Sequence, residues 1–182
     1  VIAENTCRDS ESSGIHLAFG ASRNHIVGNS IRSEQTAGEG LIQMYIGCED
    51  NLVERNTISS PSTGVGAAYG IYAAIHANRN KIRNNTINGK IAQAAICVES
   101  AWIAGTSVIE SRGFEQSSVV NGYGSEATDG VEITGNIIDL SNATTALCAI
   151  QATDTVGGVC EVTNLQLRSN IVVNTTPAGM LK

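Results

Sequence analysis

The chain is poor in the residues that usually fill a thick globular core or cover a solvated helix. Aromatic residues make up 4% of its 182 residues, charged residues make up 15%, and there are only two prolines. Glycine (19 residues), asparagine, serine, threonine and β-branched aliphatic residues are frequent instead. Few rings and many β-branched side chains are typical of an interior built from thin, repeated layers of strands.

Several classes of function lack the residues that they need. The net charge of −6 leaves no basic stripe for the phosphates of a nucleic acid, so no nucleic-acid partner is expected. No apolar run reaches the about 18 residues that span a bilayer, and we expect no membrane insertion. The GxSxG, HExxH, P-loop and EF-hand motifs are absent, and no cofactor is expected.

Cysteine and histidine are present but are not spaced as metal ligands. The cysteines form no CxxC pair and have no histidine at ligand spacing, and the three histidines (His16, His25 and His76) do not fall in one row of the repeat described below. We therefore expect no metal site. A free cysteine packs as a small hydrophobic residue, so we interpret all five as buried thiols: Cys7, Cys48, Cys97, Cys148 and Cys160.

One short pattern recurs along the chain: an apolar residue, two further residues, an asparagine, one further residue and a second apolar residue. Three copies carry another asparagine two residues before the pattern, namely Asn24, Asn51 and Asn80. Self-similarity of this kind is typical of solenoids. The six copies are Ile2/Asn5/Cys7, Ile26/Asn29/Ile31, Val53/Asn56/Ile58, Ile82/Asn85/Ile87, Ile133/Asn136/Ile138 and Leu167/Asn170/Val172.

The intervals between these asparagines set the expected number of coils. They are 24, 27, 29, 51 and 34 residues. We interpret the interval of 51 as two coils, with a degenerate copy at Val108 and Ser111, which predicts about seven coils of about 26 residues each. No signal peptide opens the chain, and Val1 stands in the middle of a copy, so we expect a fragment of a longer protein.

A second element precedes most of the asparagines by about 14 residues. It is a short run of alternating apolar residues bounded by glycine or polar residues, which predicts a half-buried strand. Glycine or asparagine interrupts every window before three helical turns could form, so a helix is not supported. The runs are 14–17, 41–44, 70–73 and 95–98, followed by weaker ones at 119–120 and 146–147.

Two or three short strands per repeat predict an all-β fold, a right-handed parallel β-helix. Each strand then pairs with its copy in the next coil, about 4.8 Å along the axis. The recurring asparagine fits a turn, where it can adopt the left-handed conformation and its amide can bond the same amide one coil above and below. We predict such an asparagine ladder, with a structural role. Residues 1–182 form one domain, in which residues 100–128 are an irregular coil or an inserted loop.

Segments 51–58 (NLVERNTI) and 80–87 (NKIRNNTI) resemble the parallel β-helix repeats of the pectin-lyase-like superfamily. The resemblance covers nearly the whole chain and is weakest between Ile91 and Asp129. The superfamily includes polysaccharide lyases, glycosidases, epimerases and bacteriophage tailspikes, and the fold does not select among them. The amino-acid composition, rich in asparagine, serine, threonine and glycine, is most similar to that of tailspikes. That similarity implies an extracellular or virion-tail homotrimer that binds, and often cleaves, a host polysaccharide.

Aligning the strand-like runs gives two rows of side chains that we expect to face solvent. The first row is His16, Gln43, Tyr72, Cys97, Asn121 and Cys148, and the second is Ala18, Tyr45, Ala74, Glu99, Tyr123 and Ile150. A sugar ring can stack on tyrosine while polar groups meet its hydroxyls, although tyrosine also favours exposed strand positions for structural reasons alone. The candidate sugar-binding residues on this face are His16, Gln43, Tyr45, Tyr72 and Tyr123.

Glycoside hydrolysis needs two carboxylates, about 5–5.5 Å apart for retention and about 6.5–9.5 Å apart for inversion. Glu99 is the only acid in the two rows, and Asp50 follows the strand two coils earlier. We name Glu99 and Asp50 as candidate catalytic residues, with Glu49, Glu110 and Glu126 as further candidates for the second acid. The alternative is that each is a solvated surface charge. The column of clustered aspartates used by calcium-dependent lyases of the superfamily is missing from the sequence.

The segment from Ser100 to Thr128 interrupts the repeat and holds the only tryptophan, Trp102. Loops that leave a rigid solenoid commonly build its binding site, so Trp102 is a further candidate for stacking on a sugar. The alternative is that it fills an end of the core, because residues 101–104 form an apolar run.

Two functions therefore stay open at the level of the sequence. The first is binding of a bacterial surface polysaccharide, with depolymerisation by glycoside hydrolysis. The second is a non-catalytic structural or adhesive β-helix that binds glycans or forms a fibre shaft.

Overall fold

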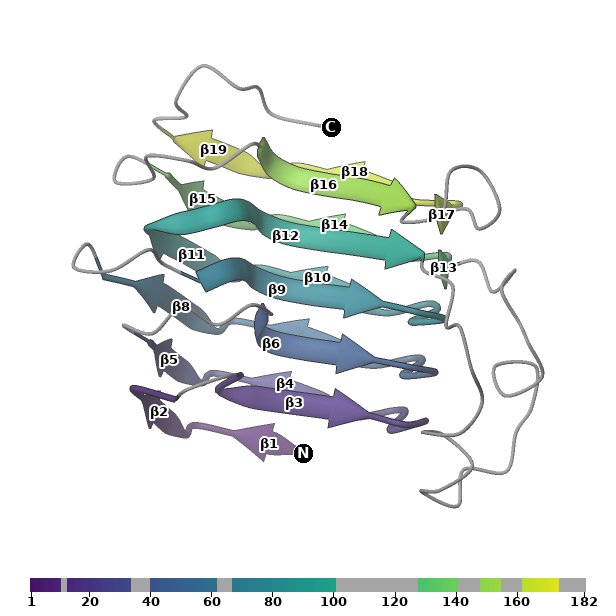
Figure 1. The fold of residues 1–182 in the computed structure, drawn as a ribbon, viewed down its shortest axis with the longest axis horizontal. Helices are drawn as coiled ribbons and strands as arrows, with labels where there is room; N and C mark the ends of the chain where they lie inside the picture. Colours follow the sequence, from purple (N-terminus) through teal and green to yellow (C-terminus); the bar gives the residue numbers. More distant parts are fainter. Residues whose placement is uncertain are drawn as a thin grey trace.

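The computed structural model describes residues 1–10, 13–33, 40–61, 67–100, 128–140, 148–154 and 162–173. In these ranges every regular element is a β-strand, and the strands pair in parallel. They stack in layers from the N-terminal to the C-terminal end (Figure 1). The predicted all-β fold with parallel coils is confirmed. None of the described segments forms a helix with the length and apolarity that crossing a membrane takes.

Three sheets form the wall of the solenoid. Sheet A contains β1 (Ile2–Ala3), β4 (His25–Val27), β7 (Leu52–Glu54), β10 (Lys81–Arg83), β14 (Glu132–Thr134) and β18 (Gln166–Arg168). Sheet B contains β2 (Thr6–Arg8), β5 (Ser30–Arg32), β8 (Thr57–Ser60), β11 (Thr86–Gly89), β15 (Ile137–Asp139) and β19 (Ile171–Val173). Sheet C contains β3 (Ile15–Ala18), β6 (Gly40–Tyr45), β9 (Ala67–Ala74), β12 (Ile91–Ser100) and β16 (Cys148–Asp154), and a small fourth sheet pairs β13 (Thr128–Asp129) with β17 (Val162–Thr163).

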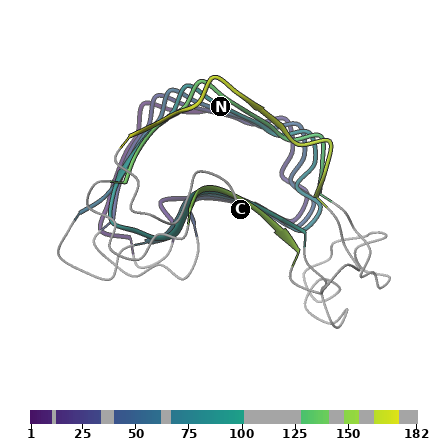
Figure 2. The ribbon, with the colours of Figure 1, turned by 90° about the horizontal axis from the view of Figure 1, so that it is seen from above.

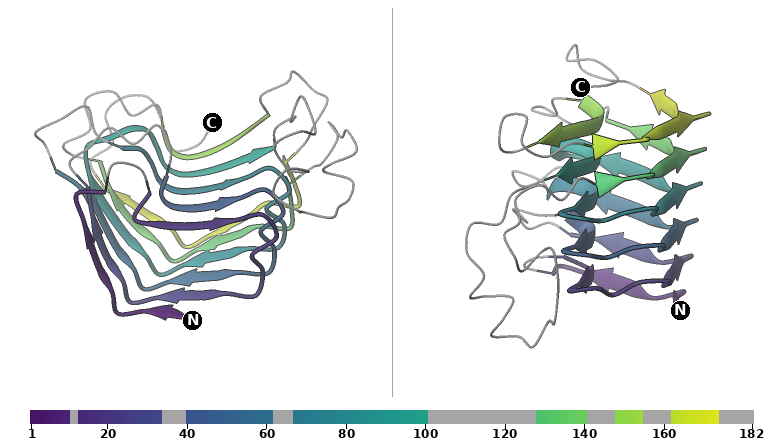
Figure 3. Two further views of the ribbon diagram at one scale, coloured as in Figure 1. Left: turned by 60° about the horizontal axis from the view of Figure 1, so that its bottom comes forward. Right: turned by 90° about the vertical axis from the view of Figure 1, so that its right-hand side faces the viewer.

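The core is a set of aliphatic columns that run along the axis of the solenoid. In sheet A, Ile82 pairs with Val53 on one side and Ile133 on the other, and all three side chains are fully buried. Because side chains alternate across a strand, the neighbours of Ile82, Lys81 and Arg83, point outward. The layers lie edge to edge in Figure 3, and they superimpose when viewed along the stack in Figure 2.

The predicted asparagine ladder is present at the turn between sheets A and B. The backbone N–H and the side-chain nitrogen of each asparagine both donate to the side-chain oxygen of the asparagine in the next coil, at 2.9–3.0 Å. The residue before each asparagine has φ between +53° and +66°, so the left-handed position precedes the asparagine instead of being the asparagine itself. The members are Asn5, Asn29, Asn56, Asn85, Asn136 and Asn170.

The prediction of an extra coil between Asn85 and Asn136 is wrong. The side chains of these two residues are hydrogen-bonded to each other at 3.0 Å, and β10 pairs directly with β14. The interval of 51 residues is therefore one coil, and sheets A and B each show six layers where about seven coils were predicted. The copy predicted at Val108 and Ser111 lies outside the described residues.

Candidate functional site

The outer side of sheet C carries most of the side chains that the sequence pointed to. Pairing of the five strands places His16, Gln43, Tyr72, Cys97 and Gln151 in one row. It places Ala18, Tyr45, Ala74, Glu99 and Thr153 in a second row. We call these two rows, together with Tyr69, whose ring stacks on that of Tyr72, the C face.

The two rows agree with the prediction through Cys97 and Glu99, and the later members differ. Cys148 pairs with Ala94 instead of following Cys97, and Ile150 points into the core instead of outward. The predicted alignment placed a layer at 119–123 between β12 and β16, but these two strands pair directly, and the register of β16 differs from the predicted one by three residues. Asn121 and Tyr123 lie outside the described residues, as does Trp102, and the places predicted for the first two are taken by Gln151 and Thr153.

The C face is also less open than predicted. His16 is exposed, but Gln43 is 1% exposed, Cys97 is fully buried and Glu99 is 6% exposed. The reason is a second, outer apolar layer, in which tyrosine rings pack over small residues of the strands. One cluster joins Tyr45, Tyr72 and Phe19 to Ile46, Ala74 and Ile75, and another joins Tyr69 and Tyr72 to Ala68, Ala94, Cys97 and Cys148.

Three tyrosine rings follow one another across the C face. The rings of Tyr69 and Tyr72 are stacked, with centroids 4.8 Å apart and planes 11° from parallel. The ring of Tyr45, one coil earlier, lies 6.3 Å from that of Tyr72, and the imidazole of His16 meets Tyr45 edge-on at 6.5 Å. The rings therefore form a continuous aromatic cluster across neighbouring coils, in which Tyr45 and Tyr72 are half-buried and Tyr69 is buried.

Tyr69 was missed because strict alternation places it on the opposite side of β9 from Tyr72. The strands of sheet C do not alternate strictly, since two successive residues, such as Leu41 and Ile42, both belong to the core. The strands of sheet C bend along their length (Figure 2), and residues three apart, such as Tyr69 and Tyr72, reach the same face. The sequence does hold a signal for this bend, because successive apolar residues recur at the same place in three strands: Leu41 and Ile42, Ala95 and Ile96, and Ala149 and Ile150.

Glu99 is the one acidic side chain described on the C face. Its Oε2 accepts a hydrogen bond from the hydroxyl of Tyr72. Burial raises the pKa of Tyr72 far above its usual range, and the carboxylate of Glu99 raises it further. The phenol therefore stays protonated and fixes the carboxylate from one side.

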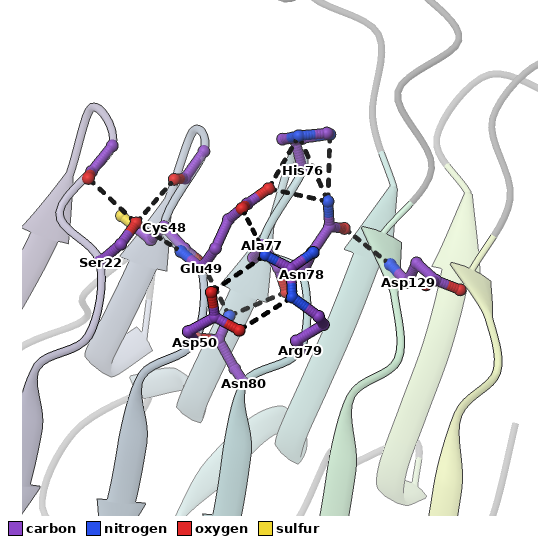
Figure 4. A network of polar contacts seen from close by, with 12 residues as sticks. Ser22, Cys48, Glu49, Asp50, His76, Ala77, Asn78, Arg79, Asn80 and Asp129 are labelled. Atoms are coloured by element: carbon purple, nitrogen blue, oxygen red, sulfur yellow. Dashed lines mark hydrogen bonds and ion pairs between the residues drawn. The ribbon is translucent and has the colours of Figure 1, made fainter.

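Asp50, the predicted catalytic partner of Glu99, is engaged elsewhere. It lies in the turn between β6 and β7, where Nε of Arg79 is 2.8 Å from Oδ1 and Nη2 is 3.0 Å from Oδ2 (Figure 4). These hydrogen bonds lower the pKa of Asp50. No contact joins Asp50 to Glu99 among the described residues, so the two predicted catalytic acids are not brought together as a pair.

Glu49 is the centre of a polar network that crosses several turns (Figure 4). Its carboxylate contacts Arg79 Nη2 at 2.7 Å, His76 Nε2 at 2.9 Å and Asn78 Nδ2 at 3.0 Å. Asn78 Oδ1 in turn accepts from the backbone N–H of Asp129 at 2.8 Å. These contacts are all internal, and we interpret the network as a brace between turns. Across the described ranges, no three His, Cys, Asp or Glu side chains are grouped so as to hold a metal ion.

The cysteines within the described residues carry thiol side chains. Cys48, Cys97 and Cys148 are buried, as predicted, while Cys7 is partly exposed. Burial raises the pKa of both Cys48 and Cys97. Cys160 lies outside the described residues.

Comparison with known proteins identifies the fold family. The family model described as "Right handed beta helix region" matches residues 1–102, more than half of the chain. The chain belongs to the right-handed β-helix family. No curated protein and no solved structure matches this β-helix significantly. A β-helix domain is compatible with polysaccharide binding or hydrolysis, and the side chains of the C face must carry any finer conclusion.

Glu54 of β7 is a second buried carboxylate, on the outer side of sheet A. Its side chain is 11% exposed and accepts from Arg83 Nε at 2.9 Å, while His25 Nε2 lies 2.9 Å from the other oxygen. Burial, the largest influence, raises the pKa of Glu54, but the bonds from Arg83 and His25 and the charges of Arg83 and Arg55 outweigh it, and the pKa is lowered.

We expect Glu54→Gln to lower the free energy of unfolding at pH 7 by about 1–2 kcal/mol, because it weakens charge-assisted hydrogen bonds that are partly shielded from water. A lowered folded-state pKa stabilises the fold above the unfolded-state pKa, and this contribution disappears as the pH falls through the folded-state value. Urea unfolding at pH 7 and at pH 3 tests this, and the difference from wild type should shrink at pH 3. The control Glu132→Gln removes a more exposed ion pair with Lys81, 3.6 Å apart, and should cost less than about 0.5 kcal/mol. A cost of Glu54→Gln that is equal at both pH values would contradict the prediction.

Proposed function

We propose that this β-helix binds a polysaccharide along the C face. The observation that carries the proposal is the aromatic cluster of Tyr45, Tyr72 and Tyr69 on the outside of sheet C, in which Tyr45 and Tyr72, from neighbouring coils, are partly exposed and Tyr69 supports them from beneath. Sugar rings present apolar faces that stack on tyrosine, and their hydroxyls hydrogen-bond to groups such as the exposed imidazole of His16. Gln43, which accepts from Ser13 Oγ at 2.9 Å, and Glu99 lie beneath this surface and support it. A polymer with a repeating unit suits a surface that itself repeats.

The biological setting that we propose is attachment to a bacterial surface, as part of a tailspike-type homotrimer outside the cell or on a virion tail. The support for this is the resemblance of repeats such as 51–58 and 80–87 to those of tailspikes. The alternative setting is an adhesive or fibre-shaft β-helix, which uses the same face for binding without cleavage.

Removing one ring tests the binding proposal. We expect Tyr45→Ala to weaken binding of the best ligand by about tenfold, because stacking is worth about 1 kcal/mol or more for a large ring. An array of purified bacterial capsular polysaccharides and lipopolysaccharide O-chains finds the ligand, and calorimetry measures its Kd. Thr57→Ala, an exposed change on sheet B, is the matched control and should leave the Kd unchanged. Equal Kd values for wild type and Tyr45→Ala would place binding elsewhere.

Glycoside hydrolysis is the second candidate, favoured by the burial of Glu99 on the same face as the rings. Hydrolysis needs two carboxylates, and since Asp50 is paired with Arg79, the proposal now rests on Glu99 with a second acid not yet assigned. New reducing ends should appear when wild type is incubated with the bound polysaccharide, and Glu99→Gln should abolish them while binding persists. Absence of new reducing ends with wild type would leave the non-catalytic function.

A further inference from the structure

We propose that the polysaccharide bound on the C face is uncharged where it meets the protein, with no uronate, sulfate or phosphate group directed at this face. The inference rests on the proposed function and specifies its substrate class. The evidence for it is the distribution of charged and polar side chains between sheet C and the rest of the described structure.

Lysine and arginine are absent from the described strands of sheet C, on which the one basic side chain is the imidazole of His16. Of the 11 lysines and arginines, Arg112 and Lys182 lie outside the described residues, and none of the other nine lies on β3, β6, β9, β12 or β16. The strands of sheets A and B do carry such residues, for example Lys81 and Arg83 on β10 and Arg8 on β2. Arg79, in the turn that follows β9, is already bound to Glu49 and Asp50. An anionic glycan would thus find no arginine fork on the strands of this face.

The side chains of the C face are apolar rings, neutral polar groups and one carboxylate, that of Glu99. Glu99 has one oxygen bonded to the Tyr72 hydroxyl, and Oε1 of Gln151, in the row of Tyr72, is buried with no hydrogen-bond partner among the described residues. Neutral polar groups of this kind and a free acceptor pair well with a sugar hydroxyl or an N-acetyl group, which carries no charge. A carboxylate or phosphate supplies only further acceptors, and the charge of Glu99, which lies beneath the rings and is little screened by water, would repel it.

The experiment compares glycans that differ in charge alone. The probes are acidic capsular polysaccharides, each used in native form and after reduction of its uronate carboxyls to hydroxymethyl groups, together with neutral O-chains. We expect wild type to bind the neutral or carboxyl-reduced forms at least about ten times more tightly than the native acidic forms, because like charges in contact are strongly unfavourable. Glu99→Gln should bring the ratio between reduced and native forms closer to one.

The outcomes separate this inference from the proposed function. Tighter binding of a native uronate polymer than of its reduced form, lost in Tyr45→Ala, would overturn the inference while upholding binding on the C face. Failure of every polysaccharide to bind would overturn the proposed function itself. If Glu99→Gln does not fold, the ratio measured with wild type still decides the inference.

Discussion

Replacing Asn85 with alanine is expected to lower the free energy of unfolding by about 3–5 kcal/mol, because several buried hydrogen bonds disappear at once. Nδ2 of Asn85 donates to Asn136 Oδ1 and to the carbonyl of Val53, both at 3.0 Å. Its Oδ1 accepts from the backbone N–H and the side chain of Asn56, at 3.0 and 2.9 Å. Alanine removes the acceptor of the Asn56 backbone N–H and takes one hydrogen bond from each of the other partners, and water has no access to a site that is fully buried.

The matched control is Asn5→Ala, at the exposed end of the same ladder. Asn5 donates to Asn29 and to the carbonyl of Ala3, and its side chain lies in contact with water, which can replace it. We expect this change to cost less than about 1 kcal/mol. Denaturant unfolding followed by circular dichroism measures both variants. A similar cost for Asn5→Ala and Asn85→Ala would mean that burial does not set the strength of the ladder.

Gly89→Ala is expected to lower the free energy of unfolding by about 3 kcal/mol or more, since both the backbone angle and the available space exclude a side chain. Gly89 ends β11 with φ of +96°, and a Cβ at this position would lie 2.0 Å from the carbonyl oxygen of Ser60. That oxygen belongs to the paired strand β8, where Gly89 and Ser60 stand side by side. The clash can be relieved only by moving one coil away from the next.

Gly28→Ala separates the strain of the angle from the lack of space. Gly28 has φ of +66°, but the nearest atom to an added Cβ is Cγ of Glu4 at 3.7 Å, an ordinary contact. We expect a cost of about 1 kcal/mol, the usual penalty for a left-handed alanine. Thermal and urea unfolding of the two variants should rank Gly89→Ala well below Gly28→Ala. Equal stability would show that the coils shift easily at Gly89.

The fold could be predicted from the sequence because each coil repeats the same local pattern of residues. Inward aliphatics such as Ile26, Val53 and Ile82 recur at a fixed distance from an asparagine, and both features are needed in every layer. The number of layers was less predictable, because loop length is only weakly coupled to stability. The interval between Asn85 and Asn136 is close to two coils in length, and only pairing of β10 with β14 shows that it is one.

The candidate site was predicted less completely than the fold. Alternation along the strands correctly placed His16, Tyr45, Tyr72 and Glu99 on one side of sheet C. It did not show that the tyrosines lie down over their neighbours, which buries Glu99, because this depends on the small residues beside them. The pairing of Asp50 with Arg79 joins residues 29 apart, one coil away, and only the register of the turns reveals it.

The asparagine ladder gives the solenoid a direction. In the bonds between neighbouring amides, the side-chain nitrogen donates toward the C-terminal coil and the side-chain oxygen accepts from the N-terminal one. From Asn29 on, the same nitrogen also donates to a backbone carbonyl of the N-terminal coil. Each layer therefore presents the same set of bonding groups to the layers on either side of it. Any coil can then follow any other without a change in the hydrogen-bond pattern of the ladder. Whole coils are therefore interchangeable, and a protein built in this way can change its length during evolution by gaining or losing entire coils.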